Sequence, residues 1–335
     1  MSQSSNHAPA IVANEGVLHL SARDISVPAS ISPEAQEYLR LGGAFSRIEQ
    51  PALEDKAGWR EHIAVMDSQI LPFLEMQTPP GKAEIRERMI GGVPVFDIVP
   101  ENLTGDENSY LFDMHGGGLI LCGGKGARQM ALRTALRYRR RVIALDYRMA
   151  PDHPYPAALD DGLAVYRALL EEYNGHNMVF HGESGGGNLV AATLLRGRDE
   201  GLSLPAGVIL NTPQLDLTES GDSFQTMSGI DMLGSLMQQN LLYADGEELS
   251  HPYLSPLFGD FTKGFPPTLL ITGTRDLFLS NTVRMHLALR AADVEADLIV
   301  IEAGRHGNFP WGPEADQQDR QTRLFIERVL AAGKG

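Results

Sequence analysis

The chain is poor in cysteine and has no long apolar run. Its 335 residues include one cysteine, Cys122, so no internal disulfide can form, and nothing points to an oxidising compartment. We expect Cys122 to be a small buried apolar residue rather than a reactive thiol. No apolar run reaches the roughly 18 residues that a membrane span needs, and residues 1–10 lack the basic start and apolar stretch of a signal peptide. These features predict a cytoplasmic protein without a membrane span.

Basic residues are also scarce. The chain has 28 Lys and Arg against 43 Asp and Glu, which gives a formal net charge of −15. Such a charge repels polyanions, so we expect no nucleic-acid partner, and it mildly disfavours strongly anionic substrates. Hydrophobic residues make up 43% of the chain, which is enough to bury one large core.

From about residue 84 onward, the hydrophobic pattern alternates between strands and helices. A hairpin is expected around Gly91-Gly92, followed by strands over 109–114, 142–146, 178–181, 207–210, 268–272 and 296–301. Helices are expected over 127–140, 157–173, 188–196, 281–292 and 314–330. This alternation predicts an α/β fold with a mostly parallel central sheet and helices on both faces, the hairpin being its antiparallel part.

Two segments interrupt this alternation. Ser32-Pro33-Glu34-Ala35 is typical of a helix start, and a second helix is expected over 53–74, before the breaker Pro79-Pro80-Gly81. Residues 215–265 are rich in polar and turn residues. We expect 31–75 and 215–265 to form a helical cap over the carboxyl ends of the strands, where open α/β sheets bind ligands. The predicted division is 1–80 (arm and first cap part), 81–214 (first core part), 215–265 (cap insertion) and 266–335 (second core part).

Gly182-Glu183-Ser184-Gly185-Gly186 matches G-x-S-x-G and lies between an expected strand and an expected helix, as that motif requires. A nucleophile on such a sharp turn is strained, and Cβ atoms on the neighbouring residues would clash, which explains the glycines. We therefore predict that Ser184 is a nucleophile. The alternative is an ordinary glycine-rich turn in which Ser184 only caps the helix.

His115-Gly116-Gly117-Gly118 directly follows the strand expected at 109–114. Consecutive glycines leave backbone N–H groups uncovered, so Gly116, Gly117 and Gly118, together with Gly185, are predicted to bind an oxyanion. The alternatives are a flexible loop or a phosphate-binding turn. Gly123-Gly124-Lys125 keeps the second one open, although Gly126 lacks the hydroxyl that a phosphate loop needs at that position.

Asp276 and His306 each follow the carboxyl end of an expected strand, and the order Ser184, Asp276, His306 is that of α/β-hydrolase triads. We predict that His306 takes the proton of Ser184 and later protonates the leaving alcohol, while Asp276 orients His306 and stabilises its imidazolium. Asp260 and Asp245 are weaker candidates for the acid, because neither follows a clear strand. No histidine or cysteine cluster has the spacing of metal ligands, so no metal is expected.

Three motifs together carry a family resemblance. They are the run His115 to Gly118, the run Asp146-Tyr147-Arg148-Met149-Ala150-Pro151 with Pro154 and Pro156, and the run Gly182 to Gly186. The chain resembles the hormone-sensitive lipase family of bacterial esterases, strongly over 85–210 and moderately over 267–330. The resemblance implies an α/β-hydrolase fold with a helical cap, hydrolysis of short- to medium-chain carboxylic esters through an acyl-enzyme, no cofactor, and a homodimer as one assembly to consider.

The sequence departs from the family pattern at three positions. Glu183 stands where the family more often has aspartate, Gly185 where alanine is commoner, and Asp276 is followed by Leu277 rather than proline. Glu183 is predicted to be an ionisable neighbour of the site or a buried partner of the oxyanion loop. His115 is a further supporting residue.

Arg148 is expected to pair with Asp160 or Asp161 and so to hold the oxyanion loop in place. In the insertion, a set of large side chains is expected either to line an adaptable acyl pocket or to form the core of the cap. These are Phe224, Met227, Met232, Met237, Leu241, Leu242 and Tyr243.

Two alternatives to a carboxylesterase remain. The same triad would serve a lactone, carbonate or amide hydrolase, and a hydrolase scaffold can also become a ligand receptor with catalysis lost. Receptor relatives of this family typically lack a working base. The presence of His306 therefore favours an enzyme.

Overall fold

The computed structural model describes residues 12–14, 17–19, 22–41 and 49–332. The predicted N-terminal arm lies partly outside these residues. Within it, the short strands β1 (Val12–Asn14) and β2 (Val17–His19) pair antiparallel. None of the helices in the described ranges is both long and apolar enough to cross a membrane.

An eight-stranded sheet forms the centre of the protein, in the order β10-β9-β8-β7-β5-β6-β4-β3. Its strands are β3 (Ala83–Ile90), β4 (Val93–Pro100), β5 (Tyr110–Met114), β6 (Arg141–Leu145), β7 (Met178–Glu183), β8 (Gly207–Asn211), β9 (Thr268–Gly273) and β10 (Ala296–Ile301). The hairpin β3–β4 and the β4–β6 pair are antiparallel, and the other pairs are parallel. The sheet predicted from the sequence is confirmed, including its antiparallel hairpin.

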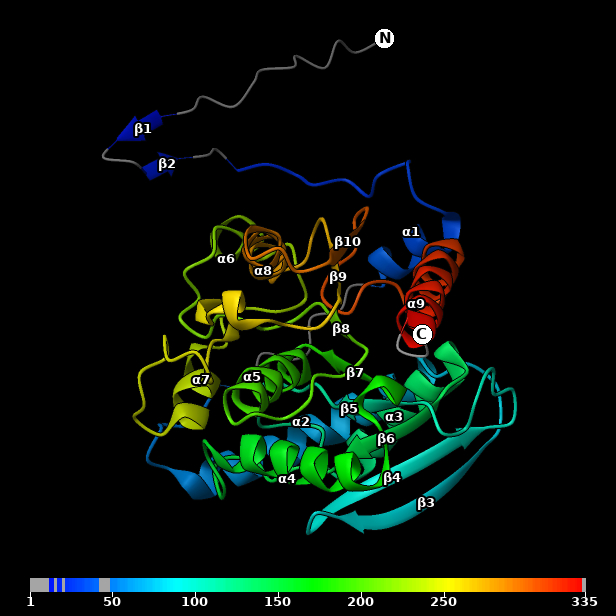
Figure 1. Ribbon diagram of the computed structural model, residues 1–335. Helices are drawn as coiled ribbons and strands as arrows, with labels where there is room; N and C mark the ends of the chain where they lie inside the picture. The colour runs from blue at the N-terminus through cyan, green and yellow to red at the C-terminus, as the bar shows by residue number, and fades with distance from the viewer. Residues whose placement is uncertain (1–11, 15–16, 20–21, 42–48, 333–335) are drawn as a thin grey trace.

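Helices cover both faces of this sheet (Figure 1). One face packs against α3 (Lys125–Tyr138) and α9 (Pro313–Ala332); the other packs against α4 (Ala157–Glu172), α5 (Gly185–Asp199) and α8 (Leu279–Ala291). Successive side chains of a strand point to opposite faces, so Leu111 enters the core under α3 and α9 while Phe112 enters the core on the other side. Because both faces are buried, the central strands are largely apolar, and the buried Asp113 of β5 and His181 of β7 bond to each other.

Helix α1 (Pro33–Arg40) begins where the sequence predicts. The Ser32 hydroxyl accepts a hydrogen bond from the Ala35 amide at 3.1 Å, and Pro33 occupies the first turn. Ser32 also donates to the Glu314 carboxylate at 2.6 Å, which joins α1 to the start of α9. Tyr38 is buried edge-to-face against Phe309, in the segment that follows β10.

Helix α2 (Lys56–Met76) corresponds to the second expected helix and lies beside α3. Asp55 caps it by accepting a hydrogen bond from the Gly58 amide at 2.8 Å, and Trp59 is fully buried. The remaining helical elements are α6 (Ser223–Thr226), α7 (Met237–Ala244) and the 3₁₀ turns η1 (Gly175–Asn177), η2 (Pro256–Phe258) and η3 (Phe261–Lys263). All of these except η1 lie in the predicted insertion.

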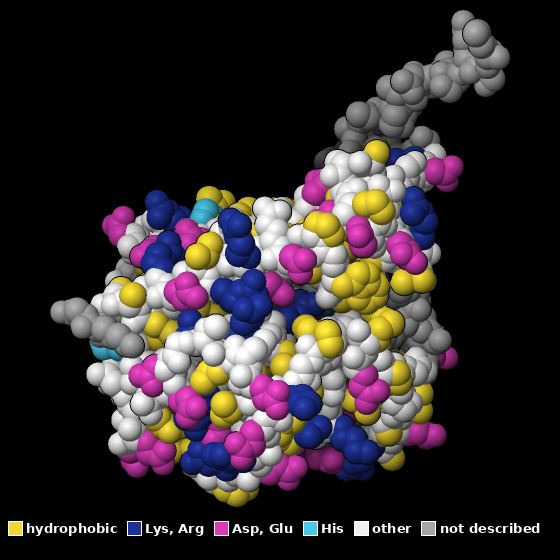
Figure 2. Space-filling model, turned by 90° about the vertical axis from the view of Figure 1, so that its right-hand side faces the viewer, with side chains coloured by type: hydrophobic (Ala, Val, Ile, Leu, Met, Phe, Trp, Pro, Cys, Tyr) yellow, Lys and Arg dark blue, Asp and Glu magenta, His cyan; other side chains and the backbone are white. Residues whose placement is uncertain are grey.

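On the face shown in Figure 2, acidic and basic side chains are interspersed with hydrophobic ones.

The antiparallel end of the sheet buries a charged side chain. Asp97 of β4 is 2% exposed and accepts hydrogen bonds from Arg88 of β3 at 2.9 Å and from Arg141 of β6 at 2.8 Å. Burial by itself raises the pKa of Asp97, but the two guanidinium groups offset this and leave the pKa lowered.

We expect Asp97→Asn to lower the free energy of unfolding by about 2–3 kcal/mol, because it leaves two arginines without their shared buried carboxylate. A lowered folded-state pKa means that this contribution is complete above the unfolded-state pKa of about 3.9 and is lost as the pH falls further. Urea denaturation at pH 7 and at pH 3 measures both effects.

Glu84→Gln is the matched control, because Glu84 pairs with Arg86 on the same hairpin with both side chains 59% exposed. We expect this change to stay within about 0.5 kcal/mol of the wild-type protein. Equal losses in the two variants would contradict the special role of the buried carboxylate.

Candidate active site

Ser184 stands at the junction between β7 and α5. Its φ of +57° and ψ of −125° lie outside the regions that L-residues normally occupy, a strain of about 1–3 kcal/mol. A Cβ on Gly186 would lie 1.9 Å from the Met114 carbonyl oxygen, so only glycine allows α5 to start this close to β5. The Ser184 amide donates to the Asn211 carbonyl at 3.0 Å, which ties the turn to β8. This is the strand–turn–helix setting that the motif requires.

The glycine loop after β5 lies against this turn. Gly117 has a φ of +121°, and a Cβ there would lie 2.3 Å from the Leu121 carbonyl oxygen. A Cβ on Gly185 would lie 3.2 Å from the Gly118 amide nitrogen, so the two stretches approach closely. Within the described part of the chain, the amides of Gly116, Gly117, Gly118 and Gly185 donate to no protein acceptor. The structure thus brings the predicted oxyanion donors together and leaves them unpaired.

His115 and Tyr147 support this loop from within the protein. Their rings stack with centroids 4.1 Å apart, and the Tyr147 hydroxyl donates to the His115 carbonyl at 2.7 Å. Burial lowers the pKa of His115, so the ring is neutral and its Nδ1 donates to the Gly116 carbonyl at 2.8 Å. These contacts fix two of the carbonyl groups and thereby orient the amides that follow.

Asp276 and His306 meet at the carboxyl ends of β9 and β10. The His306 Nδ1 lies 3.2 Å from the Asp276 Oδ1, and the fully buried carboxylate also accepts from the Thr272 hydroxyl at 2.7 Å and the Phe278 amide at 3.0 Å. The Phe278 ring packs edge-to-face against His306. Burial by itself lowers the pKa of His306, but the bond to Asp276 and the surrounding carboxylates leave it raised.

Ser184 and His306 line the same pocket, of about 510 Å³, together with Gly116, Gly117 and Gly118. Since Nδ1 of His306 is bonded to Asp276, Nε2 is the ring nitrogen left to accept a proton. No direct hydrogen bond joins the serine hydroxyl to the ring in this structure; such contacts are often loose before substrate binds. The arrangement has the groups that acyl transfer requires.

Glu183 lies beside the turn and pairs with a buried arginine. Its Oε2 accepts from Arg133 Nη2 of α3 at 2.8 Å and from the Asn211 side chain at 3.1 Å. Burial by itself raises the pKa of Glu183, but the charges of Arg133 and His306 outweigh it and leave the pKa lowered. Of the two predicted roles, the ionisable neighbour matches this geometry, because the carboxylate bonds α3 and β8.

Arg148 pairs with Asp161, one of its two expected partners, through Nη2 at 2.7 Å and through its own amide at 2.9 Å. Asp160 instead accepts from Arg196. Arg148 therefore braces the start of α4. The contact with the oxyanion loop comes from its neighbour Tyr147.

The two rival acids lie elsewhere. Asp260 caps η3, and Asp245 ends α7. A different carboxylate, Asp231, accepts hydrogen bonds from the amide of His306, at 3.2 Å to Oδ2 and 3.3 Å to Oδ1. Sequence reasoning missed Asp231 because it follows no strand and lies within the irregular insertion.

The pocket walls come from α2, from α3 and from residues 228–239 of the insertion. Of the seven large insertion residues considered above, Met232 lines the pocket; Phe224, Leu242 and Tyr243 are packed in the core. The remaining apolar lining includes Met66, Ile70, Leu74, Leu121, Met130, Leu233 and Leu236.

Cys122 also borders the pocket. Its thiol is buried, and burial raises the pKa of the thiol to about 12. This agrees with an unreactive apolar side chain.

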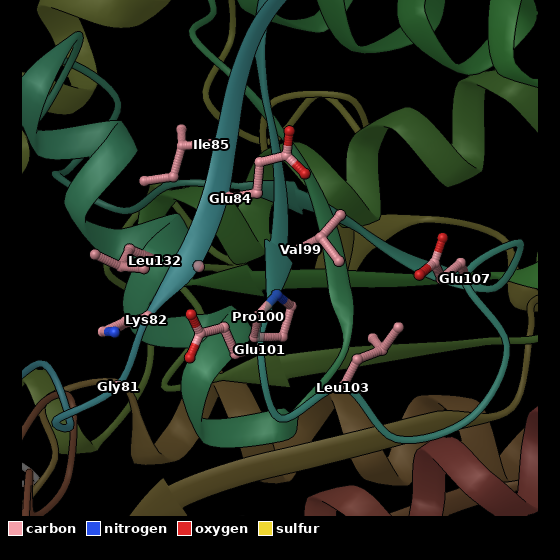
Figure 3. A pocket seen from close by; sticks show the side chains of 11 residues that line it. Gly81, Lys82, Glu84, Ile85, Val99, Pro100, Glu101, Leu103, Glu107 and Leu132 are labelled. Atoms are coloured by element: carbon pink, nitrogen blue, oxygen red, sulfur yellow. The ribbon is translucent and has the colours of Figure 1, made fainter.

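Two other features are remote from this chemistry. In the turn Gly123-Gly124-Lys125, the Gly124 amide donates to the Asp146 carboxylate at 2.8 Å. This amide is therefore already paired within the protein, which disfavours the phosphate-binding alternative. A cavity of about 770 Å³ lies at the β3–β4 hairpin (Figure 3). Its wall carries Lys82, Glu84 and Glu101, and none of the predicted catalytic residues.

A serine at a strained strand–helix turn, facing free amides and a histidine–carboxylate pair, defines the class of serine hydrolases. Comparison with known proteins agrees. A family model described as the alpha/beta hydrolase fold matches residues 111–309, and the chain belongs to this family.

The relatives include esterases, acetyl-hydrolases and a gibberellin receptor from Arabidopsis thaliana, which is 27% identical over 183 residues that cover 50% of this chain and 53% of that receptor. A carboxylesterase from Mycobacterium tuberculosis is 33% identical over 281 residues, which cover 77% of this chain and 88% of that protein. The crystal structure of one esterase superposes with a TM-score of 0.85 at 32% identity and covers 94% of this chain and 99% of the other. A hormone-sensitive lipase from a metagenome library superposes with a TM-score of 0.77 at 26% identity over 88% and 98% of the two chains. The predicted hormone-sensitive lipase family and carboxylic ester hydrolase activity are confirmed.

Removing the hydroxyl of Tyr147 tests the support of the glycine loop. We expect Tyr147→Phe to reduce kcat/KM about tenfold, because the amides that face the pocket lose their fixed position. It also leaves the buried His115 carbonyl without its donor, which costs about 1–2 kcal/mol of stability. Ester hydrolysis and urea denaturation measure the two effects.

Tyr166→Phe is the matched control. Tyr166 is also buried, and its hydroxyl donates to the Ser203 carbonyl, beyond the far end of α5. We expect a similar loss of stability with kcat/KM near that of the wild type. A comparable loss of kcat/KM in both variants would show that Tyr147 acts only through general stability.

Proposed function

We propose that this carboxylesterase works through a triad of Ser184, His306 and Asp276. His306 Nε2 removes the Ser184 proton as the hydroxyl oxygen attacks the ester carbonyl, and it then protonates the departing alcohol. Water repeats these steps on the acyl-enzyme: it gives a proton to His306, and the carboxylic acid leaves as Ser184 is regenerated. Asp276 keeps the proton on Nδ1 and stabilises the imidazolium.

Gly117, Gly118 and Gly185, with Gly116 beside them, would bind the oxyanion of both tetrahedral intermediates. The loss of one such donor typically costs about 3–4 kcal/mol of transition-state stabilisation. The start of α5 adds the positive end of its dipole at the same place. His115 would act by fixing this loop, and Glu183 and Arg148 by holding the elements around it.

The observation that carries the proposal is the bond from His306 Nδ1 to the buried Asp276 carboxylate, in the pocket that Ser184 also lines. A receptor would have no use for an oriented base. Lactones, carbonates and amides would meet the same groups, so they are alternative substrates for the same chemistry.

We also propose that residues 31–75 and 215–265 form the cap, because both segments line the pocket. We further propose that the protein is cytoplasmic and has no nucleic-acid partner.

A serine-reactive organophosphate tests the triad. We expect the probe to label Ser184 with loss of esterase activity, and Ser184→Ala to be unlabelled and at least 10⁴-fold less active. Peptide mass mapping locates the label. Ser255→Ala is the control, since Ser255 is a buried serine that donates to the Leu249 carbonyl. Retained hydrolysis in Ser184→Ala would remove the serine from the mechanism.

The pH profile tests the base. The raised pKa of His306 predicts that kcat/KM falls on the acidic side at a pH above the ordinary histidine value of about 6.5, since only the neutral ring accepts a proton. Asp276→Asn should lower kcat by about 10⁴-fold through the wrong tautomer. Full activity down to pH 5 in the wild type would contradict His306 as the base.

Substrate size follows from the pocket. Its apolar walls suit short- and medium-chain acyl groups, and its volume of about 510 Å³ lies in the lower half of the range of small-molecule sites, about 300–1,000 Å³. We expect nitrophenyl acetate, butyrate and octanoate to be hydrolysed far faster than the palmitate. Nitrophenyl esters keep the leaving group constant, so the comparison isolates chain length; a preference for palmitate would contradict the predicted range.

A further inference from the structure

Asp231 is a buried carboxylate that belongs to neither the predicted triad nor any salt bridge among the described residues. It is 8% exposed and lies in the insertion between α6 and α7. Its two oxygens accept hydrogen bonds from backbone amides only: Leu277 to Oδ2, Leu233 to Oδ1 at 3.2 Å, and His306 to both, at 3.2 and 3.3 Å.

These amides come from three different segments. Leu277 directly follows Asp276 on the loop after β9, His306 is on the loop after β10, and Leu233 belongs to the insertion itself. One side chain therefore clamps both loops that carry the acid–base pair. It clamps them to the same turn whose Met232, Leu233 and Leu236 line the substrate pocket.

The charges around His306 are mostly negative. Asp276, Asp231 and Glu183 all act on its ring, and of these Glu183 is partly neutralised by Arg133 of α3. The charges of His306 and Asp276 act in turn on the pKa of Asp231. The charge of Asp231 also acts on the pKa of Tyr38 in α1, where Arg305 opposes it. Burial raises the pKa of Asp231, and the positive charge of His306 opposes this rise. A protonated His306 thus has two buried carboxylates close to it.

We propose that Asp231 is a second positioning carboxylate of the active site, which holds the His306 backbone and stabilises its imidazolium while fixing the adjacent pocket wall. This inference rests on the proposed role of His306 as the base. Asp231 acts through His306 and not on the substrate. Its contribution is therefore separable from that of Asp276, which bonds the ring itself.

The test is the pH profile of kcat/KM for Asp231→Asn with nitrophenyl butyrate. Asparagine keeps the shape but removes the charge, so the pKa of His306 should fall. Because activity requires the neutral ring, the acidic limb should move to lower pH by about half a unit to one unit. We also expect kcat to fall about tenfold, since an NH₂ group replaces one acceptor and loosens the His306 loop.

Asp216→Asn is the matched control. Asp216 is a fully buried carboxylate in the same insertion, but it bonds Arg284, Thr218 and Ser220 rather than the amides at the active site. This variant should lose stability and keep the wild-type acidic limb. Asp231→Glu provides the rescue: it restores the charge, so its acidic limb should return toward the wild-type position even where kcat stays low.

An acidic limb that stays in place in Asp231→Asn, or that moves to higher pH, would overturn the proposal and leave Asp231 as a structural residue like Asp216. Thermal unfolding of each variant shows that the measured enzyme is folded. The proposed function has its own test: an inactive Ser184→Ala together with an unmoved limb in Asp231→Asn would remove only the present inference.

Discussion

The close approach of the turn at Ser184 to the neighbouring strand is the constraint on which the site depends. Gly186 lies so near the Met114 carbonyl that a single added carbon would be 1.9 Å away. Only glycine at this position lets α5 begin so close to β5, and Ser184, two residues earlier in the same turn, has a strained conformation. The same packing brings Gly185 against the loop at Gly118, so the hydroxyl and the free amides are positioned by one contact. The large buried core around this turn maintains that strain.

Electrostatics adds a second level of order around the turn. Three carboxylates, on Asp276, Asp231 and Glu183, surround His306, and only Glu183 is paired with an arginine. These charges favour the protonated ring of His306. In the proposed mechanism they would stabilise the imidazolium that forms when His306 takes the Ser184 proton, with little reorganisation of the surroundings.

The pocket is a composite of segments far apart in the chain. α2 precedes the sheet, residues 228–239 interrupt it, and the glycine loop belongs to it. Two of these segments lie outside the repeating strand–helix pattern. We therefore infer that changes in them can alter the substrate range while the turn at Ser184 and the free amides of the glycine loop stay the same.

The sequence alone determined the elements and the chemistry. Strand–helix periodicity located each central strand within about two residues, and Ser32 with Pro33 marked the start of α1, because these signals depend on neighbouring residues only. The motif around Ser184, the glycines after His115, and the order of Asp276 and His306 indicated a hydrolase, because each stands at the end of a strand. Tertiary structure decided the rest. Asp161 rather than Asp160 pairs with Arg148, Tyr147 supports the glycine loop, Met232 lines the pocket, and Asp231 reaches both catalytic loops. The first two contacts join different elements of the core, and the last two involve residues of an irregular insertion. No periodic pattern encodes which of its side chains fold back against the sheet; that depends on how the whole chain packs.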